Sequence, residues 1–261
     1  MINLIMFLLS ALSAEARLPV YHRELLPYVQ MAPDQGETST CLFMASTGAI
    51  ELLANKKNNV RNPVPYGPYD LSEAYTIHGD DFEIAGKYFW EIPVQKYNYG
   101  YGIHTSRWPV SAWTGNWEDQ SIWQWQDYSK MKKTKVPKVE TIPLFVLGNK
   151  YSTEVLDKTH IQQIKEALVK YNSPILVNYV DDDYWHVVLI VGYDDRLPGS
   201  CYEVEGIDCN KDLGSFFVRD SFGLGVEVRD YDWFRMQGNA AFVVKEKKAA
   251  RRAIVNKKAS R

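Results

Sequence analysis

Cysteine is scarce in this sequence, because only three of its 261 residues are cysteines: Cys41, Cys201 and Cys209. No cluster of histidine and cysteine has the spacing of a zinc site, so the sequence predicts no metal centre of that kind. Since the count is odd, at least one thiol stays unpaired. Cys201 and Cys209 lie in one short segment, which we expect a disulfide to close. The alternative is two free thiols, because a bridge needs a geometry that sequence does not show.

Long hydrophobic runs are also missing at the N-terminus, where the apolar stretch Leu4–Leu12 is too short to span a membrane. Ala14 and Ala16 follow it at the A-x-A spacing of an export signal. We therefore expect residues 1–16 to be a signal peptide and the protein to be secreted or periplasmic. No Lys or Arg precedes the run, so a buried N-terminal helix or strand is the alternative. No cysteine follows it directly, and no stable membrane anchoring is predicted.

Positive charge is in deficit over most of the chain and in excess only at its C-terminal end. The net charge is −2, yet residues 245–261 contain eight Lys or Arg against one Glu, a net charge of +7. Residues 1–244 therefore carry −9. We expect a solvated basic tail over 245–261, after a single domain over 17–244 that has enough apolar residues for a substantial core. Aromatic and basic residues do not interleave on a recognisable module, so no nucleic-acid partner is predicted.

The segment from Gln35 to Lys56 predicts a buried helix. Thr38–Thr40 are good N-cap residues, and a nearly unbroken run of apolar residues and helix formers follows them. Little polar surface appears before Asn55, so we expect this helix to run through the protein interior. Cys41 would then lie in its first turn, where the positive end of the helix dipole stabilises a thiolate. That is a reactive position for a cysteine.

Three apolar, β-branched runs near the other end of the chain predict successive antiparallel strands, at residues 173–180, 181–195 and 214–223. A helix should precede them over 160–172, because Ile161, Ile164, Ala167 and Leu168 share one of its faces. His186 lies near the start of the second strand and Asp220 near the end of the third. We therefore expect their side chains to lie side by side at one end of a sheet.

These blocks together resemble the papain-like cysteine peptidases. Asp34–Gly36 form a DQG-type turn whose glutamine stands six residues before Cys41, as the oxyanion glutamine of the family does. DLSE at 70–73 resembles the LSE segment of the family. HVVLIVGYDD at 186–195 resembles the strand with the catalytic histidine, and VRDSFG at 218–223 resembles the VKNSWG segment around the orienting asparagine. AIELL at 49–53 resembles the family's helix after the nucleophile, and the order and spacing of all five blocks agree.

Several positions depart from the family pattern. Thr38 stands where the family usually has a disulfide-bonded cysteine, and Leu42 replaces the aromatic residue after the nucleophile. Asp220 replaces the orienting asparagine, and Phe222 replaces the tryptophan that shields it. The GCNGG-like segment is missing. The resemblance is therefore to a divergent member.

The resemblance implies an α+β fold of two lobes, with the helix of Cys41 packed against an antiparallel sheet or barrel. It implies an exported cysteine endopeptidase without a cofactor, whose partners are a peptide or protein substrate and, possible in this family, a protein inhibitor. Cys41 would be the nucleophile and His186 its acid–base partner, with Asp220 orienting the imidazole and Gln35 donating to the oxyanion. One alternative is an acyl transferase or deamidase with the same residues. Another is a binding protein that has kept the scaffold without catalysis.

Three further segments give weaker indications. Five of the eight tryptophans lie between Trp108 and Trp125, where they could stack on ligands, although packing of a loop-rich subdomain is the favoured interpretation. Residues 130–138 are predicted to form a solvated basic connection. Asp208, Asn210 and Asp212 alternate as calcium ligands do, but the glycine that follows is one place late for an EF-hand turn. No calcium site is predicted.

Overall fold

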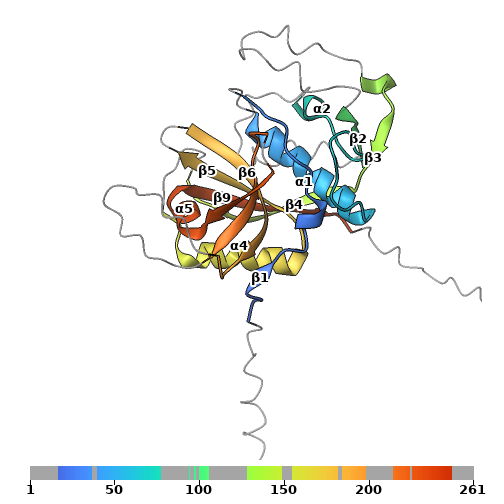
Figure 1. Ribbon diagram of the computed structural model, residues 1–261. Coiled ribbons are helices and arrows are strands. Elements are labelled where there is room, and N and C mark those ends of the chain that lie inside the picture. Colours follow the sequence, from blue (N-terminus) through green and yellow to red (C-terminus); the bar gives the residue numbers. More distant parts are fainter. Residues whose placement is uncertain are drawn as a thin grey trace, which may run out of the picture.

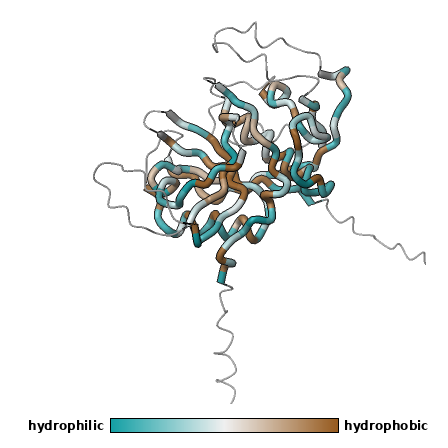
Figure 2. The backbone as a smooth tube through the Cα atoms, in the orientation of Figure 1, coloured by the Kyte–Doolittle hydropathy of each residue, from teal (hydrophilic) through white to brown (hydrophobic). Residues whose placement is uncertain are grey.

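One long helix lies against an antiparallel sheet in the computed structural model of the chain (Figure 1). Hydrophobic residues gather along the strands and the helix in the middle of the molecule, and hydrophilic ones lie mostly around them (Figure 2). The structure describes residues 17–36, 40–77, 94, 97, 100–105, 128–148, 155–181, 184–197, 214–223 and 225–248.

Helix α1 (Cys41–Lys57) is the predicted interior helix. Every residue from Cys41 to Asn55 is buried, so the helix has no solvent face over its first 15 residues. That follows from its composition, because a helix that is apolar all round is stable only inside a protein. Thr40 takes the N-cap position, but its side chain makes no capping hydrogen bond. The expectation that a threonine or serine hydroxyl caps this helix is therefore wrong for Thr40, while Thr38 and Ser39 lie outside the described residues.

The main sheet is antiparallel throughout. Its strands follow the order β4 (Val139–Val146), β9 (Gly238–Glu246), β5 (Ile175–Asp181), β6 (Tyr184–Asp194), β7 (Ser215–Arg219) and β8 (Val226–Asp230). Strand β1 (Tyr21–His22) pairs with the end of β6. A separate pair is made by β2 (Tyr101–Ile103) and β3 (Lys133–Lys135). The other helices that the structure describes in full are α2 (Glu73–Ile77), α4 (Lys158–Tyr171) and α5 (Tyr231–Gln237), with short 3₁₀ turns at η1 (Leu26–Tyr28) and η7 (Tyr128–Lys130).

The three predicted strands are β5, β6 and β7, and they are successive antiparallel neighbours. Leu189 of β6 lies opposite Arg219 of β7, so the ends of these strands bring His186 and Asp220 together as predicted. The predicted helix before them is α4, and its buried residues are Ile161, Ile164, Ala167 and Leu168. It ends at Asn172, whose left-handed backbone (φ 45°) turns the chain into β5.

Two boundaries differ from the sequence-based expectations. Strand β9 runs to Glu246, two residues into the predicted basic tail, because its ladder with β4 continues to the pair Val139–Glu246. Lys133–Lys135, inside the predicted basic connection, form strand β3. The predicted signal peptide, the Trp108–Trp125 segment, the pair Cys201 and Cys209 and the calcium-like triplet lie outside the described residues. None of the helices in the described part of the chain could cross a membrane.

A buried arginine joins the sheet to the helix. The guanidinium of Arg219, at the end of β7, donates to the Gln30 carbonyl (2.8 Å), to the Met44 carbonyl of α1 (3.1 Å) and to the Glu51 carboxylate (3.2 Å). Arg219 is only 2% exposed, so these bonds replace its hydration. Burial outweighs the attraction of Arg219 and raises the pKa of Glu51 to about 7. Gly48 makes room for this contact, because a Cβ there would lie 2.0 Å from Nη1 of Arg219.

Replacing Gly48 by alanine should therefore destabilise the protein, although alanine is favoured over glycine in a helix by about 1 kcal/mol. The added methyl group would displace the Arg219 guanidinium and weaken a buried ion pair, a change that costs about 3 kcal/mol when one partner is lost. Urea denaturation should show a net loss. Ser46→Ala, in the same helix, is the control that should leave stability nearly unchanged. A more stable Gly48→Ala protein would contradict this account of the glycine.

Candidate active site

Cys41 is the first residue of α1 and is almost fully buried. It is a free thiol. The helix begins at this residue, so its thiol lies where the unsatisfied N–H groups of the first turn concentrate positive charge. This is the location that the sequence predicted for it. The helix start, rather than a loop, therefore fixes the position of the sulfur.

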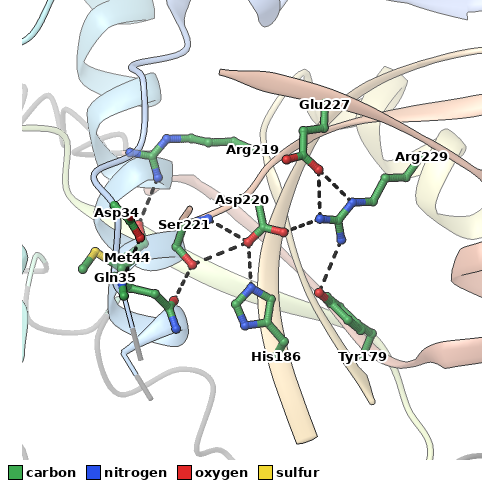
Figure 3. Close-up of polar contacts among 11 residues, drawn as sticks. Asp34, Gln35, Met44, Tyr179, His186, Arg219, Asp220, Ser221, Glu227 and Arg229 are labelled. Carbon is green, nitrogen blue, oxygen red and sulfur yellow. Dashed lines mark hydrogen bonds and ion pairs between the residues drawn. The ribbon is translucent and has the colours of Figure 1, made fainter. Parts of the chain in front are cut away.

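His186 and Asp220 form a buried hydrogen bond, in which Nε2 of the imidazole donates to Oδ1 of the carboxylate at 2.7 Å (Figure 3). Nδ1 is the ring nitrogen that remains for the thiol of Cys41. Burial alone would lower the pKa of His186, but the bonds to Asp220 and to Cys41 outweigh it and raise the pKa to about 9. The charged imidazole is therefore favoured at neutral pH. Burial would raise the pKa of Asp220, but the hydrogen bond from His186 keeps it lowered.

Two aromatic rings hold the imidazole in place. Phe222 stacks on it with ring centroids 5.2 Å apart and planes inclined by 6°, and Tyr179 meets it edge-on at 5.3 Å. Phe222 is 43% exposed, so it covers one face of His186 and presents its own other face to solvent. Phe222, which replaces the shielding tryptophan of the family pattern, thus covers one face of the imidazole.

Gln35 lies beside the same group of residues. Its backbone N–H donates to the Ser221 carbonyl (2.8 Å), and its side-chain oxygen accepts a hydrogen bond from the Ser221 hydroxyl (Figure 3). That bond orients the carboxamide, leaving its NH₂ group to point away from Ser221. Gly36 has φ of +56°, and its N–H donates to Oδ1 of Asp34 at 2.8 Å. The predicted DQG turn is therefore a true tight turn.

The second oxygen of Asp220 accepts a hydrogen bond from Nη2 of Arg229, a residue of β8. The guanidinium also donates to the Glu227 carboxylate (2.9 and 3.1 Å) and to the Tyr179 hydroxyl (3.4 Å). Arg229 was not among the site residues predicted from the sequence. The signal was the alternation of valine with charged residues from 226 to 229, which is typical of a strand with one charged face and would have placed Glu227 and Arg229 together.

The structure thus brings all four predicted site residues into one region. His186 contacts Asp220 directly and interacts with Cys41, and Gln35 is joined to Asp220 through Ser221. In the part of the chain that the structure describes, no three His, Cys, Asp or Glu residues are arranged to hold a metal ion. The chemistry that these side chains offer is that of a thiol next to an acid–base group and an amide donor.

Comparisons with known proteins give a structural match only. Neither the protein-family models nor the curated proteins contain a match. A recombinant stem bromelain precursor has 12% identity and a TM-score of 0.54, over 88% of this chain and 72% of its own. The digestive procathepsin L 3 of Tenebrio molitor larval midgut has 15% identity and a TM-score of 0.53, over 90% and 72%. The cysteine protease and lectin-like domains of Cwp84 from Clostridium difficile have 17% identity and a TM-score of 0.55, over 89% and 53%.

Identities this low establish the fold and nothing finer. The mixture of helices with an antiparallel sheet agrees with the α+β architecture that the sequence predicted. These structural matches cover 88% and 90% of this chain. The chain therefore has the fold of the papain-like cysteine proteases.

Proposed function

We propose that this protein is a cysteine peptidase that hydrolyses peptide bonds, with Cys41, His186 and Asp220 as its catalytic residues. The observation that carries the proposal is the buried hydrogen bond between His186 and Asp220, which lies beside a thiol at a helix N-terminus. The papain-like fold supports it, because that fold is shared with proteases of this chemistry. Because proteins with one fold can have different functions, the proposal rests mainly on the arrangement of Cys41, His186 and Asp220.

In the proposed reaction the Cys41 thiolate attacks the carbonyl carbon of the scissile peptide bond. The His186 imidazolium then gives its proton to the leaving amine, and a thioester with the enzyme remains. Neutral His186 next takes a proton from water, whose oxygen attacks the thioester and releases the carboxylic acid and the Cys41 thiolate, so that the thiolate and the imidazolium are both restored. Asp220 holds the imidazole in the orientation that points Nδ1 at the sulfur. Buried carboxylate and thiolate both favour the charged imidazole on which the first step depends.

Gln35 supplies the proposed oxyanion donor. Its carboxamide is held by Ser221, so the NH₂ group needs no reorganisation when negative charge develops on the substrate oxygen. The backbone N–H of Cys41, at the start of α1, is the second donor. An acyl transfer or a deamidation would use the same residues, and analysis of the products distinguishes these reactions from hydrolysis.

We further propose that residues 1–16 direct export and that residues 17–246, to the end of β9, form the catalytic domain. The apolar run Leu4–Leu12 and the A-x-A spacing support this part of the proposal. The site of action would then be the periplasm or the outside of the cell. Peptides or proteins would be the substrates, and a protein inhibitor could control the activity.

The first test is hydrolysis of a diverse peptide library by residues 17–261 under mild reducing conditions. Cys41→Ala should abolish cleavage while leaving the circular dichroism spectrum unchanged, because it removes the nucleophile and retains a small buried side chain. His186→Ala should lose activity as well. Cleavage by a pure Cys41→Ala protein would contradict the assignment. A folded parent that neither cleaves peptides nor reacts with iodoacetamide at Cys41 would indicate a binding protein instead.

The pH dependence should show an alkaline limb near the raised pKa of His186, about 9. Activity requires the charged imidazole, so kcat/KM should hold through neutral pH and fall as pH rises through that value. The same shift is linked to stability. The folded-state pKa lies above the ordinary 6.5, so protonation of His186 stabilises the fold fully below that value and no longer does so above about 9. Thermal unfolding measured from pH 6 to 10 separates loss of stability from loss of catalytic activity. An alkaline limb of kcat/KM near pH 6.5 would refute the prediction.

Gln35→Ala should lower kcat about 100-fold with little change in KM, as expected for loss of one oxyanion donor. Alkylation of Cys41 by iodoacetamide should keep its parental rate, because that reaction forms no oxyanion. Gln30→Ala is the matched control. Gln30 is also buried, but its amide donates to the Val64 carbonyl (3.1 Å) and is not part of the site. Equal losses in the two variants would show that Gln35 acts only through stability.

A further inference from the structure

The negative charge of Asp220 is balanced by Arg229, which binds the carboxylate oxygen that His186 does not use. One carboxylate oxygen accepts from Nε2 of His186 and from the Ser221 N–H, both at 2.7 Å. The other accepts from Nη2 of Arg229. The Asp220 side chain is completely buried, so protein donors rather than water determine how its charge acts on the imidazole.

The guanidinium of Arg229 is held in its position beside Asp220 by contacts with other residues. Its Nε and Nη2 both donate to the same oxygen of Glu227, its neighbour on the same face of β8. The guanidinium carbon lies 4.6 Å from the ring centre of Trp233, an arrangement in which a cation is attracted to the indole face. Its side chain is only 17% exposed. These contacts come from β8 and α5 and require neither substrate nor His186, so the cation is in place before catalysis.

A carboxylate and an amide differ chiefly in charge at this position. A bare carboxylate would strengthen the imidazolium more than a neutral amide does. A carboxylate in contact with a guanidinium has most of that charge cancelled, while its oxygen still accepts the hydrogen bond. The pair Asp220–Arg229 is therefore close, in its electrostatic effect on His186, to the neutral asparagine that stands at this position in the peptidases that the sequence resembles.

We propose that Arg229 is a positioning residue of the active site, which compensates the charge of Asp220 and so limits how strongly the imidazolium of His186 is favoured. This inference rests on the proposed function for its catalytic meaning. Arg229 acts through Asp220 and touches neither Cys41 nor His186 in the described contacts. Its role is to set the pH range over which His186 can give up the proton that the reaction requires.

The other groups that face the imidazole of His186 do not balance the charge of Asp220 as Arg229 does. From α1 it faces the Cys41 thiol, and from β5 the Tyr179 ring, whose hydroxyl already accepts from Arg229. Glu227 opposes the charge of Arg229, but its side chain is 26% exposed and therefore partly screened by water, whereas Asp220 is not. Arg229 is thus the cation that neutralises the carboxylate on which His186 depends.

The test is the titration of His186 by NMR in a Cys41→Ala background, with its signal assigned as the one lost in His186→Gln. This background removes the thiol that couples to the imidazole, and it needs no catalysis. Arg229→Met should raise the pKa of His186 by about one unit, because the uncompensated carboxylate favours imidazolium. Arg229→Lys keeps the charge and should restore most of the parental value. Arg196→Met, which removes an arginine from the distant buried Asp194, should change nothing.

A second comparison guards against misfolding of Arg229→Met. Asp220→Asn alone removes the buried carboxylate beside His186 but keeps the Arg229 cation, so it should lower the pKa of His186. Asp220→Asn with Arg229→Met should bring that pKa back up. The proposal is overturned if Arg229→Met leaves the His186 pKa unchanged or lower, or if the double variant equals Asp220→Asn.

Hydrolysis assays in the Cys41 protein separate this inference from the proposed function. The alkaline limb of kcat/KM should move upward in Arg229→Met, together with the NMR titration. If the His186 titration shifts in Arg229→Met but the parent protein cleaves no peptide, the charge compensation is supported and the peptidase function is refuted. If the parent is an active peptidase but the titration does not shift, the peptidase function is supported and the charge compensation is refuted.

Discussion

The contact of Arg219 with helix α1 is the constraint on which the rest of the site depends. Its guanidinium bonds a carbonyl and a carboxylate of α1 as well as a carbonyl of the segment before it, so the end of β7 cannot slide along the helix. Asp220 is the next residue, and Cys41 begins the same helix. One buried ion pair thus sets the separation between the part of the sheet that carries His186 and Asp220 and the helix that carries the thiol of Cys41.

A second set of bonds joins the turn after β7 to the segment before α1. Ser221 binds both the backbone and the side chain of Gln35, and Phe222 forms a bridge with Asp34 while stacking on His186. Three consecutive residues, 220–222, therefore contact the proposed general acid, the proposed oxyanion donor and the turn that positions it. Precise placement of several groups by one short, buried segment is what preorganisation requires.

Sequence was sufficient where the pattern is local. The continuous apolar run gives α1, the helical spacing of Ile161, Ile164 and Leu168 gives α4, and three β-branched runs give β5 to β7. The spacing of the motifs around Cys41 and His186 was enough to predict that the four site residues lie in one region. Strand β8 was not predicted, although the alternation of valine with charged residues over 226–229 is typical of a strand. The contacts of Arg229 with Asp220 and Trp233 join residues of different elements and form only on folding, so no local pattern shows them. The extension of β9 was missed for a similar reason, since its last residues are held by pairing with β4 rather than by apolar burial.

The place of β9 in the sheet has a consequence for synthesis. It is the last of the described strands along the chain, yet it lies between β4 and β5, bonded to both. A ribosome releases the N-terminal part first, so the thiol helix and the histidine strand emerge well before the strand that fills the gap in their sheet. The sheet can close only when residues 238–246 are free to insert. The sheet that Cys41 and α1 pack against therefore stays incomplete until residues 238–246 have been synthesised.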